Sequence, residues 1–535
     1  MAGWVSANTR CQFGRRRHLL GQTLWNGYFD RGLHGGGIQR GPRNAAFSRR
    51  RGFEANGVQV KRLNGVDAMM LYSETPEIHM HTLKIGVLDV SGVDGFDFDM
   101  FRTVARARLH ALAPLRYQLV DIPLQFHHPM WVQNAELDLD YHVRRAKVAA
   151  PGGRRELDQL IGEIAGTPLD RNHPLWEMYI AEGLADNRIA IIHKVHHVLA
   201  DGVASANQMA MAIQPDEPQV GGQLAATPGE SRTPANLLRA AARDHVRLIR
   251  RLPRLMNETA TGVARVRRKA RERGRHPDLA RNFAPPPTFI NHVVSPGRRF
   301  ATAPLALVDV KETAKHLGVT LNDIVLATAA GALRQLLLRY DKKADSPLIA
   351  GVPVSFDTSP QRLVGNEFTY MTPSLPVHVG DPLERVRLTA TSTAIAKENN
   401  HLLGPTLIPS WLSYLPPAVT PRIFRMQARR VESASVMNLT ISNVPGPRDR
   451  GFVEGATVDE IYSVGPIVAG SGMNITVWSY VDQLSISVLT DDRTLDDPHE
   501  ATDALIESFV EIRRAAGLPG DLTPVESALP LAPAT

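Results

Sequence analysis

The chain has 535 residues, too many for one ordinary hydrophobic core, and this length favours two or three domains. The hydrophobic content of 43% and charged content of 21% are typical of a globular protein, and no run approaches the roughly 18 consecutive apolar residues of a membrane-spanning helix. The single cysteine, Cys11, excludes an internal disulfide framework and a cysteine-based metal site, and it suits a reducing compartment.

The net charge of +7 is distributed unevenly along the chain. Residues 1–60 carry +8 and residues 235–282 carry +10, so the rest of the chain carries −11. The globular part is therefore acidic, and the basic residues are concentrated in segments expected to lie outside its core. That part shows no basic groove with interleaved aromatic side chains, so no nucleic-acid partner is expected.

The first 58 residues are rich in arginine and glycine and lack helical or strand periodicity, which predicts a disordered basic leader. They lack the apolar stretch of a secretory signal. An arginine-rich organelle transit peptide and an overlong predicted start are the alternative interpretations.

Residues 59–214 are predicted to form a first α/β lobe. Strand-like runs at 84–90 and 188–196 alternate with helical patterns at 100–112 and 155–165. Residues 215–288 are predicted to be a linker, whose first twenty residues are rich in Gly, Pro, Thr and Glu.

This linker contains a predicted basic amphipathic helix over 235–256, in which apolar residues at helical spacing lie beside an arginine stripe. The stripe consists of Arg239, Arg243, Arg247, Arg250 and Arg254. One interpretation is docking to an anionic membrane surface, and the other is a helix laid on the acidic body of its own protein. The second is favoured because Pro253 interrupts the stripe and the body is acidic.

Residues 289–518 are predicted to form a second α/β lobe, followed by a disordered tail over 519–535. The lobe is indicated by a long apolar helix over 321–338, buried strands at 349–355 and 437–442, and an alternating hairpin over 475–489. No short-period repeat is present, which argues against solenoids and propellers.

The β-branched run from Arg188 ends in the sequence HHVLADG at 196–202 and is followed by a helical stretch, which predicts a strand, a tight loop and a helix. Strand alternation places His193 and His197 on one face and His196 on the other. A metal site would require all three imidazoles to converge on one ion, which a regular strand prevents. A structural histidine cluster stays open, but use of one histidine as a general base is favoured, because neutral imidazole accepts a proton at cellular pH.

Asp201 has two candidate roles: to hydrogen-bond the imidazole as in a catalytic triad, or to fix the loop by capping the helix and pairing with a distant Arg or Lys. Gly202 directly after it suggests a tight turn with unusual backbone angles, which favours the loop-fixing role.

The 196–202 segment resembles the HHxxxDG signature of the CoA-dependent acyltransferase superfamily, and the surrounding chain is similar to the bacterial wax ester synthase/diacylglycerol acyltransferase family. Other segments resemble that family in the same order and span residues 62 to about 510. They are LNGVDA at 63–68, PLDRNHPLWE at 168–177, VTLNDIVLA at 319–327, VPVS at 352–355, GN at 365–366, SNVPGP at 442–447 and GMNIT at 472–476.

This resemblance implies two similar chloramphenicol-acetyltransferase-like α/β lobes with a channel between them and a long crossover linker. In such enzymes the second histidine of the motif is the base; carried over, this is His197, and His196 and Asp201 complete the predicted catalytic set. The resemblance implies acyl-CoA as co-substrate, no cofactor, no metal and no covalent acyl-enzyme. The expected location is the cytoplasm, with peripheral contact to the inner face of a membrane or to lipid droplets.

Other matched residues are candidates for the substrate channel, although each has a structural interpretation. Pro174, Leu175 and Trp176 could line the acyl channel, but an aromatic residue in an apolar strand is more often core. Asn322 and Asp323 fit a helix capping box. The remaining candidates are Asn443, in a turn that the family places beside the channel, and Asn474.

The sequence therefore predicts an O-acyltransferase that moves an acyl group from acyl-CoA to diacylglycerol or a long-chain alcohol. Two alternatives stay open: a carrier-protein-dependent acyltransferase of the same superfamily, and a non-catalytic lipid-binding or lipid-droplet protein that keeps the fold. The intact histidine motif and the absence of an attached carrier segment argue against them.

Overall fold

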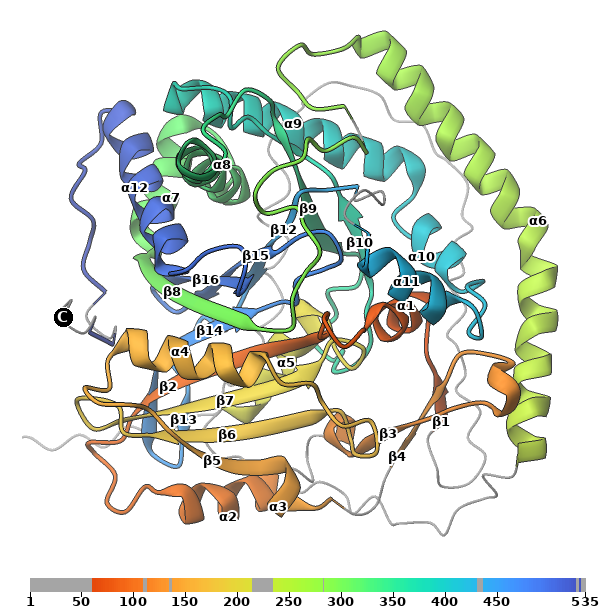
Figure 1. The fold of residues 1–535 in the computed structure, drawn as a ribbon, viewed down its shortest axis with the longest axis horizontal. Coiled ribbons are helices and arrows are strands. Elements are labelled where there is room, and N and C mark those ends of the chain that lie inside the picture. Colours follow the sequence, from red (N-terminus) through yellow and green to blue (C-terminus); the bar gives the residue numbers. More distant parts are fainter. Residues whose placement is uncertain are drawn as a thin grey trace, which may run out of the picture. The chain divides into compact units, whose positions relative to one another are not determined.

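The computed structural model describes residues 60–108, 113–133, 137–213, 234–281, 283–430, 436–525 and 529–530, and all of them belong to one compact unit. The predicted leader at 1–58 lies outside these residues. Within them the chain forms two large mixed sheets with helices on their faces, as the α/β prediction requires (Figure 1).

The first sheet carries the histidine motif. Its strands, in order across the sheet, are β13 (Phe452–Val453), β14 (Ala456–Val464), β2 (His81–Asp89), β7 (Arg188–His196), β6 (Trp176–Glu182) and β5 (Val143–Lys147). Helix α4 (Arg154–Ala165) packs its apolar residues on one face of this sheet. Helices α2 (Phe98–Arg108) and α5 (Gly202–Ala212) lie over the other face.

The second sheet lies in the C-terminal half. Its order is β10 (Phe368–Met371), β9 (Leu348–Ser355), β12 (Leu439–Pro445), β15 (Met473–Tyr480), β16 (Gln483–Asp491) and β8 (Arg298–Ala306), with β11 (Ser374–Leu375) paired to β9. The helices α7 (Leu307–Leu317), α8 (Leu321–Tyr340), α9 (Pro382–Leu403) and α12 (His499–Ala515) surround its core. The predicted long helix, strands and hairpin are confirmed as α8, β9, β12 and β15–β16.

Helix α8 is, among the described helices, the one long and apolar enough to cross a membrane by length and composition, with a mean hydropathy of 1.3. Its apolar side chains pack in the protein interior, because 72% of its apolar segment is buried and the helix packs against α9 and α12. Burial on most sides explains why this helix is hydrophobic around its circumference.

A small third sheet joins β1 (Val60–Arg62), β4 (Met130–Gln133) and β3 (Tyr117–Val120). Beside it lie short elements of both halves, which supply contacts used below. They are α1 (Gly65–Ser73), η2 (Ala113–Arg116), η3 (Pro123–Gln125), α3 (Leu139–His142), α10 (Leu407–Leu412) and α11 (Thr420–Ala428).

The chain does not divide into lobes at residue 289 as predicted, because β13 and β14 return from the C-terminal half to the first sheet. Strand β14 pairs antiparallel with β2, for example Tyr462 opposite Ile85. Local periodicity marks 456–464 as a strand but carries no information about its partner, so the sequence placed it in the second lobe.

Buried charged groups join the two sheets. Arg154 of α4 is fully buried, and its guanidinium contacts Glu460 Oε2 at 2.7 Å, Tyr462 Oη at 2.8 Å and Thr302 Oγ1 at 3.1 Å. These partners come from β14 and β8. The ion pair therefore connects a helix of the first lobe to strands that belong to both sheets.

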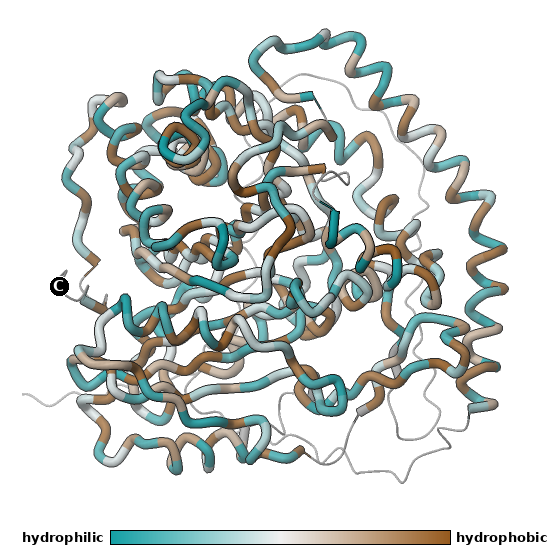
Figure 2. Tube along the Cα trace, viewed as in Figure 1, coloured by the Kyte–Doolittle hydropathy of each residue, from teal (hydrophilic) through white to brown (hydrophobic). Residues whose placement is uncertain are grey.

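The predicted basic helix is longer than expected: α6 spans Pro234–Arg273, with Pro253 inside it. The expected interruption at Pro253 is wrong, because proline removes a single backbone donor and the helix is held by packing along its length. It lies against α9, α10 and η3 (Figure 1), with Ala241, Leu255 and Gly262 buried. Figure 2 shows hydrophobic and hydrophilic residues alternating along it.

The predicted disordered tail at 519–535 is also corrected in part. Thr523 donates two hydrogen bonds to Asp309, and Leu529 is buried with its N–H bonded to Glu460 Oε1 at 2.7 Å. The Ala- and Pro-rich composition indicates no regular element, and none forms in residues 519–525 and 529–530, the part of the tail that the structure describes. The described part is ordered instead by single contacts with the two lobes.

Candidate functional site

The histidines at the end of β7 point in opposite directions, as strand alternation predicts. His193 and Val195 face the side covered by α2 and α5, where they line a cavity. On the other face Lys194 donates to Thr167 Oγ1 at 2.8 Å, and His196 is fully buried. His197 follows the last strand residue in a turn and is only partly buried. Of the adjacent pair, His197 is the ring that keeps some exposure.

The ring of His197 is held by Asn366, from the segment after β9. His197 Nδ1 lies 2.8 Å from Asn366 Oδ1. The amide orientation is fixed, because Asn366 Nδ2 donates to the His197 carbonyl at 2.7 Å and to Asp67 Oδ1 at 2.9 Å. Since Asn366 Oδ1 can only accept, His197 Nδ1 carries the proton, and the lone pair is on Nε2.

The electrostatic surroundings keep His197 neutral. Removal of the ring from water lowers its pKa to about 4, the charge of Asp201 opposes this shift, and Lys84 reinforces it. The imidazole is therefore unprotonated at cellular pH. A neutral ring with a fixed tautomer and a free Nε2 lone pair can act as a general base.

His196 holds the turn that follows β7. Its Nδ1 accepts from the N–H of Val198 at 3.0 Å, and its Nε2 lies 3.3 Å from Glu74 Oε1 at the end of α1. Burial alone would raise the pKa of Glu74, but the neighbouring His196 and Arg171 outweigh burial and lower it. The structure thus corrects the expectation that His196 is catalytic, because the sealed ring fixes the turn that presents His197.

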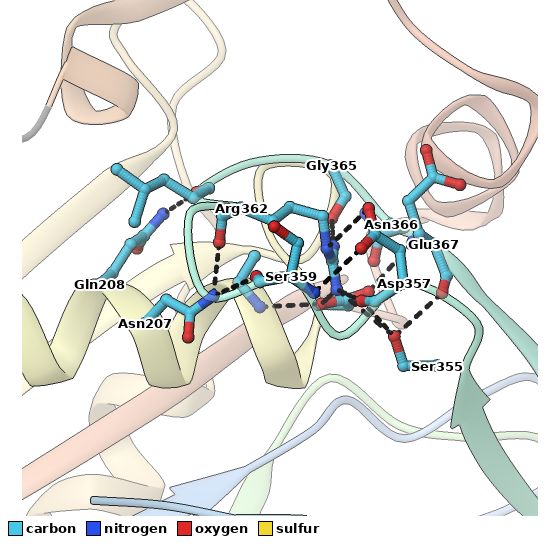
Figure 3. Close-up of polar contacts among 12 residues, drawn as sticks. Asn207, Gln208, Ser355, Asp357, Ser359, Arg362, Gly365, Asn366 and Glu367 are labelled. Atoms are coloured by element: carbon cyan, nitrogen blue, oxygen red, sulfur yellow. Dashed lines mark hydrogen bonds and ion pairs between the residues drawn. The ribbon is translucent and has the colours of Figure 1, made fainter. Parts of the chain in front are cut away.

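Asp201 has the loop-fixing role that its sequence context favours, and it does not bond the imidazole. It caps α5 by accepting from the N–H of Ala204 at 3.0 Å, and the same oxygen accepts from Arg362 Nη2 at 2.8 Å. Its other oxygen accepts from the N–H of Glu367 at 3.0 Å. Asp201 therefore ties the histidine loop to the segment that carries Arg362, Asn366 and Glu367 (Figure 3), and these contacts do not include the imidazole contact that a catalytic role would need.

Gly202 is needed for space. It is the first residue of α5 and does not have the positive φ that the sequence suggested. A Cβ atom there would lie 2.9 Å from Val444 Cγ2, so the glycine allows β12 of the second lobe to approach the helix. The half-buried Asn443 precedes Val444 on β12.

The segment 174–176 belongs to the core. Pro174, Leu175 and Trp176 are buried, and the Trp176 indole donates to the carbonyl of Leu115 at 2.7 Å and stacks on His142. Trp176 supports the wall behind the cavity without lining it. The alternative interpretation of this segment as core is the one that the structure favours.

Asn322, Asp323 and Asn474 do not join the site. Asp323 forms the predicted capping box with Thr320 at the start of α8, where Asn322 also lies, and its second oxygen accepts from Thr393. Asn474 is buried, donates to the carbonyl of Pro466 and accepts from Thr476. Their polar groups hold the second lobe together.

An apolar cavity of about 120 Å³ lies between the first sheet and the helices α2 and α5. Most of its wall is hydrophobic, and one end holds polar side chains. The lining includes Leu88, Phe101, Ile191, Met209, Ile213 and Val458. Because Val195 and His193 belong to this wall, the cavity runs along the strand face that ends at His197.

The described residues contain no group of three or more His, Cys, Asp or Glu side chains placed to hold a metal ion. Sequence reasoning missed Asn366, Arg362 and Asp67 as parts of the site. Asn366 and Asp67 stood in the matched segments GN and LNGVDA, but no local signal links them to a histidine that is far away in sequence.

Comparisons with known proteins show which family the chain is similar to. Residues 63–325 match the family model of the wax ester synthase/diacylglycerol acyltransferase catalytic domain, and residues 364–513 match that of its C-terminal domain. The chain is 57% identical over 473 residues to a provisionally assigned diacylglycerol O-acyltransferase of Mycobacterium tuberculosis H37Rv, covering 88% of this chain and 99% of the relative. It is 29% identical over 440 residues to the O-acyltransferase WSD of Acinetobacter baylyi, covering 80% and 92%.

Solved structures show the same fold. The wax ester synthase/diacylglycerol acyltransferase of Marinobacter aquaeolei matches with a TM-score of 0.62 at 23% identity, covering 86% of this chain and 100% of that one. The first condensation domain of the CDA synthetase matches with a TM-score of 0.53 at 14% identity, covering 88% and 99%. The predicted two-lobed α/β architecture is confirmed.

Proposed function

The chain belongs to the wax ester synthase/diacylglycerol acyltransferase family, and we propose that it transfers a long-chain acyl group from acyl-CoA to the hydroxyl of a diacylglycerol or long-chain alcohol, with His197 as general base. The observation that carries this assignment is the hydrogen bond from His197 Nδ1 to Asn366, which leaves Nε2 free to accept a proton.

The chemistry follows from that lone pair. His197 Nε2 takes the proton of the acceptor hydroxyl as its oxygen attacks the thioester carbonyl, and the imidazolium formed is held through Nδ1–H by Asn366. Collapse of the tetrahedral intermediate breaks the carbon–sulfur bond, and the CoA thiolate recovers the proton from Nε2. The products are the ester and free CoA. The apolar cavity along β7 is the proposed site of the acyl chain.

A product assay tests the proposal. Purified protein is incubated with radiolabelled palmitoyl-CoA and either diacylglycerol or hexadecanol, and the lipids are separated by chromatography. We expect labelled triacylglycerol or wax ester, and a loss of about 100-fold or more in His197→Ala. His401→Ala, an exposed histidine on α9, is the matched control. Equal yields from His197→Ala and the unchanged protein would refute the base, and transfer from acyl carrier protein but not palmitoyl-CoA would refute the donor.

The outer face of α6 supports a further part of the proposal, which is docking to an anionic phospholipid surface from the cytoplasmic side. The inner face rests on the protein, for instance through Tyr414, whose hydroxyl donates to the carbonyl of Leu248. On the outer face Val246, Ile249 and Met256 are exposed to 47%, 67% and 58%. Exposed arginines of the predicted stripe flank them. Apolar side chains beside cations suit a membrane or lipid-droplet surface, where the lipid acceptors are found.

A further inference from the structure

The apolar cavity has one polar end, formed by Lys84 of β2, His193 of β7 and Ser205 of α5. Apolar residues make up most of the remaining wall, and a cavity that binds only a hydrocarbon chain does not need these polar groups. The proposed base is His197, and the transfer described above uses none of the three as a hydrogen-bond donor or acceptor, although the charge of Lys84 helps to lower the pKa of His197.

Lys84 is 5% exposed, and the carboxylate of Asp201 acts on it only through its charge, without a salt bridge among the described residues. Its Nζ donates to Ser463 Oγ at 2.5 Å and lies 5.2 Å from the centre of the Trp478 ring. Burial lowers the pKa of Lys84 to about 7. An ammonium group has three donors, and lysine is rarely buried without a charged partner. Lys84 can therefore donate to an acceptor inside the cavity.

His193 and Ser205 have spare hydrogen-bonding capacity at the same place. His193 Nε2 and Ser205 Oγ are both buried, and neither bonds to any described residue. Burial lowers the pKa of His193 to about 4, so the ring is neutral and Nε2 is a donor or an acceptor according to the tautomer. Buried polar atoms are normally bonded, which makes two unbonded ones beside a buried lysine notable.

This polar end is the end nearer to His197. Lys84 and His193 are paired across β2 and β7, and His193 precedes His197 by four residues, roughly 13 Å along an extended strand. Ser205 lies in the first turn of α5, directly after the histidine loop. The opposite end is closed by Leu88, Ile213 and Val458, which are apolar.

We propose that Lys84, His193 and Ser205 form a subsite for an oxygen substituent on the acyl chain, so that the enzyme accepts acyl-CoA donors with a hydroxyl or oxo group near the middle of the chain. An amine, a hydroxyl and a neutral imidazole together supply donors and acceptors for such an oxygen. The inference rests on the proposed use of acyl-CoA.

Steady-state kinetics with matched donors test the subsite. The kcat/KM values of palmitoyl-CoA, 10-hydroxypalmitoyl-CoA and ω-hydroxypalmitoyl-CoA are measured with hexadecanol as acceptor. An apolar cavity would disfavour either hydroxylated donor by roughly 10-fold or more, because a hydroxyl would be buried without a partner. We expect 10-hydroxypalmitoyl-CoA to match or exceed palmitoyl-CoA and the ω-hydroxy donor to be disfavoured.

Two variants locate the effect. Ser205→Ala and Lys84→Met remove polar groups from the subsite, and each is expected to lower the ratio of 10-hydroxypalmitoyl to palmitoyl kcat/KM by about 10-fold. Ala212→Val, at the apolar end of the same cavity, is the control and is expected to change both values alike. Ser205→Ala keeps the test informative if the lysine variant fails to fold.

The outcomes separate this inference from the proposed function. If palmitoyl-CoA is used but 10-hydroxypalmitoyl-CoA is disfavoured 10-fold, or if the ratio is unchanged in Ser205→Ala, the subsite is refuted and the acyltransferase stands. If no acyl-CoA is used, the proposed function fails. The subsite is then tested without turnover by calorimetric binding of 10-hydroxypalmitate and palmitate, and tighter binding of palmitate would refute it.

Discussion

Replacement of Asn366 provides a direct test of how His197 is held. Asn366→Ala removes the acceptor for His197 Nδ1–H and leaves a buried donor unpaired. Such a loss costs about 1–3 kcal/mol, equivalent to roughly 5- to 150-fold in kcat/KM if the bond holds the imidazolium in the transition state. The assay is release of CoA thiol from palmitoyl-CoA with hexadecanol as acceptor.

The variant Asn366→Asp changes the pH dependence instead. With a pKa of about 4, His197 is about 99% neutral at pH 6. A carboxylate beside Nδ1–H stabilises the charged ring and raises this pKa; at an ordinary value of about 6.5 only about 24% would be neutral at pH 6. In the unchanged protein the low pKa of His197 preserves activity until the pH falls through about 4. In Asn366→Asp the raised pKa of His197 makes activity fall at a higher pH. We therefore expect up to a roughly 4-fold loss at pH 6 that disappears near pH 8.

The control is Asn207→Ala. Asn207 also joins α5 to the segment after β9, because its Nδ2 donates to the carbonyls of Ser359 and Arg362 at 3.0 and 2.8 Å, but it does not contact the imidazole (Figure 3). It should lower the unfolding temperature without moving the acid limb of the pH profile. The reasoning is refuted if Asn366→Ala keeps full kcat/KM, or if both asparagine variants shift the profile equally.

Two further predictions concern stability and membrane docking. Arg154→Ala leaves Glu460 buried without its partner and is expected to lower the free energy of unfolding, measured by chemical denaturation, by about 3–5 kcal/mol. Arg155→Ala, which breaks an exposed ion pair on the same helix, should lower it by about 1 kcal/mol or less. Similar values for the two variants would contradict the role given to the buried pair. Ile249→Glu should reduce co-sedimentation with phosphatidylglycerol vesicles by about 10-fold or more, whereas Val308→Glu on α7, which is also exposed to solvent, should leave it unchanged. Unchanged binding by Ile249→Glu would rule out α6 as the docking face.

Structural features that depend on residues close together in the sequence could be predicted from the sequence. The opposite orientations of His196 and His197 follow from strand alternation, and the capping box of Thr320 and Asp323 follows from a spacing of three residues. Both are short-range consequences of backbone geometry. The lobe strands and the long helix α8 were found for the same reason.

The partners of the site could not be predicted, because they come from distant parts of the chain. Asn366 lies 169 residues from His197 and Arg362 lies 161 residues from Asp201. The sequence indicated that Asp201 needed a distant cation but not which one. Similarly, the pairing of β14 with β2 is set by packing between halves, which single-sequence periodicity does not encode.

That pairing has a consequence for how the protein is made. Strand β2 receives its β14 neighbour only after the chain has been synthesised to Val464, so until then the nascent first lobe presents an unpaired sheet edge. Val453 and Val458, which help to close the acyl cavity, arrive with the same segment. A fragment that stops before β13 would lack both the edge strand and the cavity wall. Expression of the N-terminal half alone should give an aggregation-prone product, and separate production of the two halves is not a route to a working enzyme.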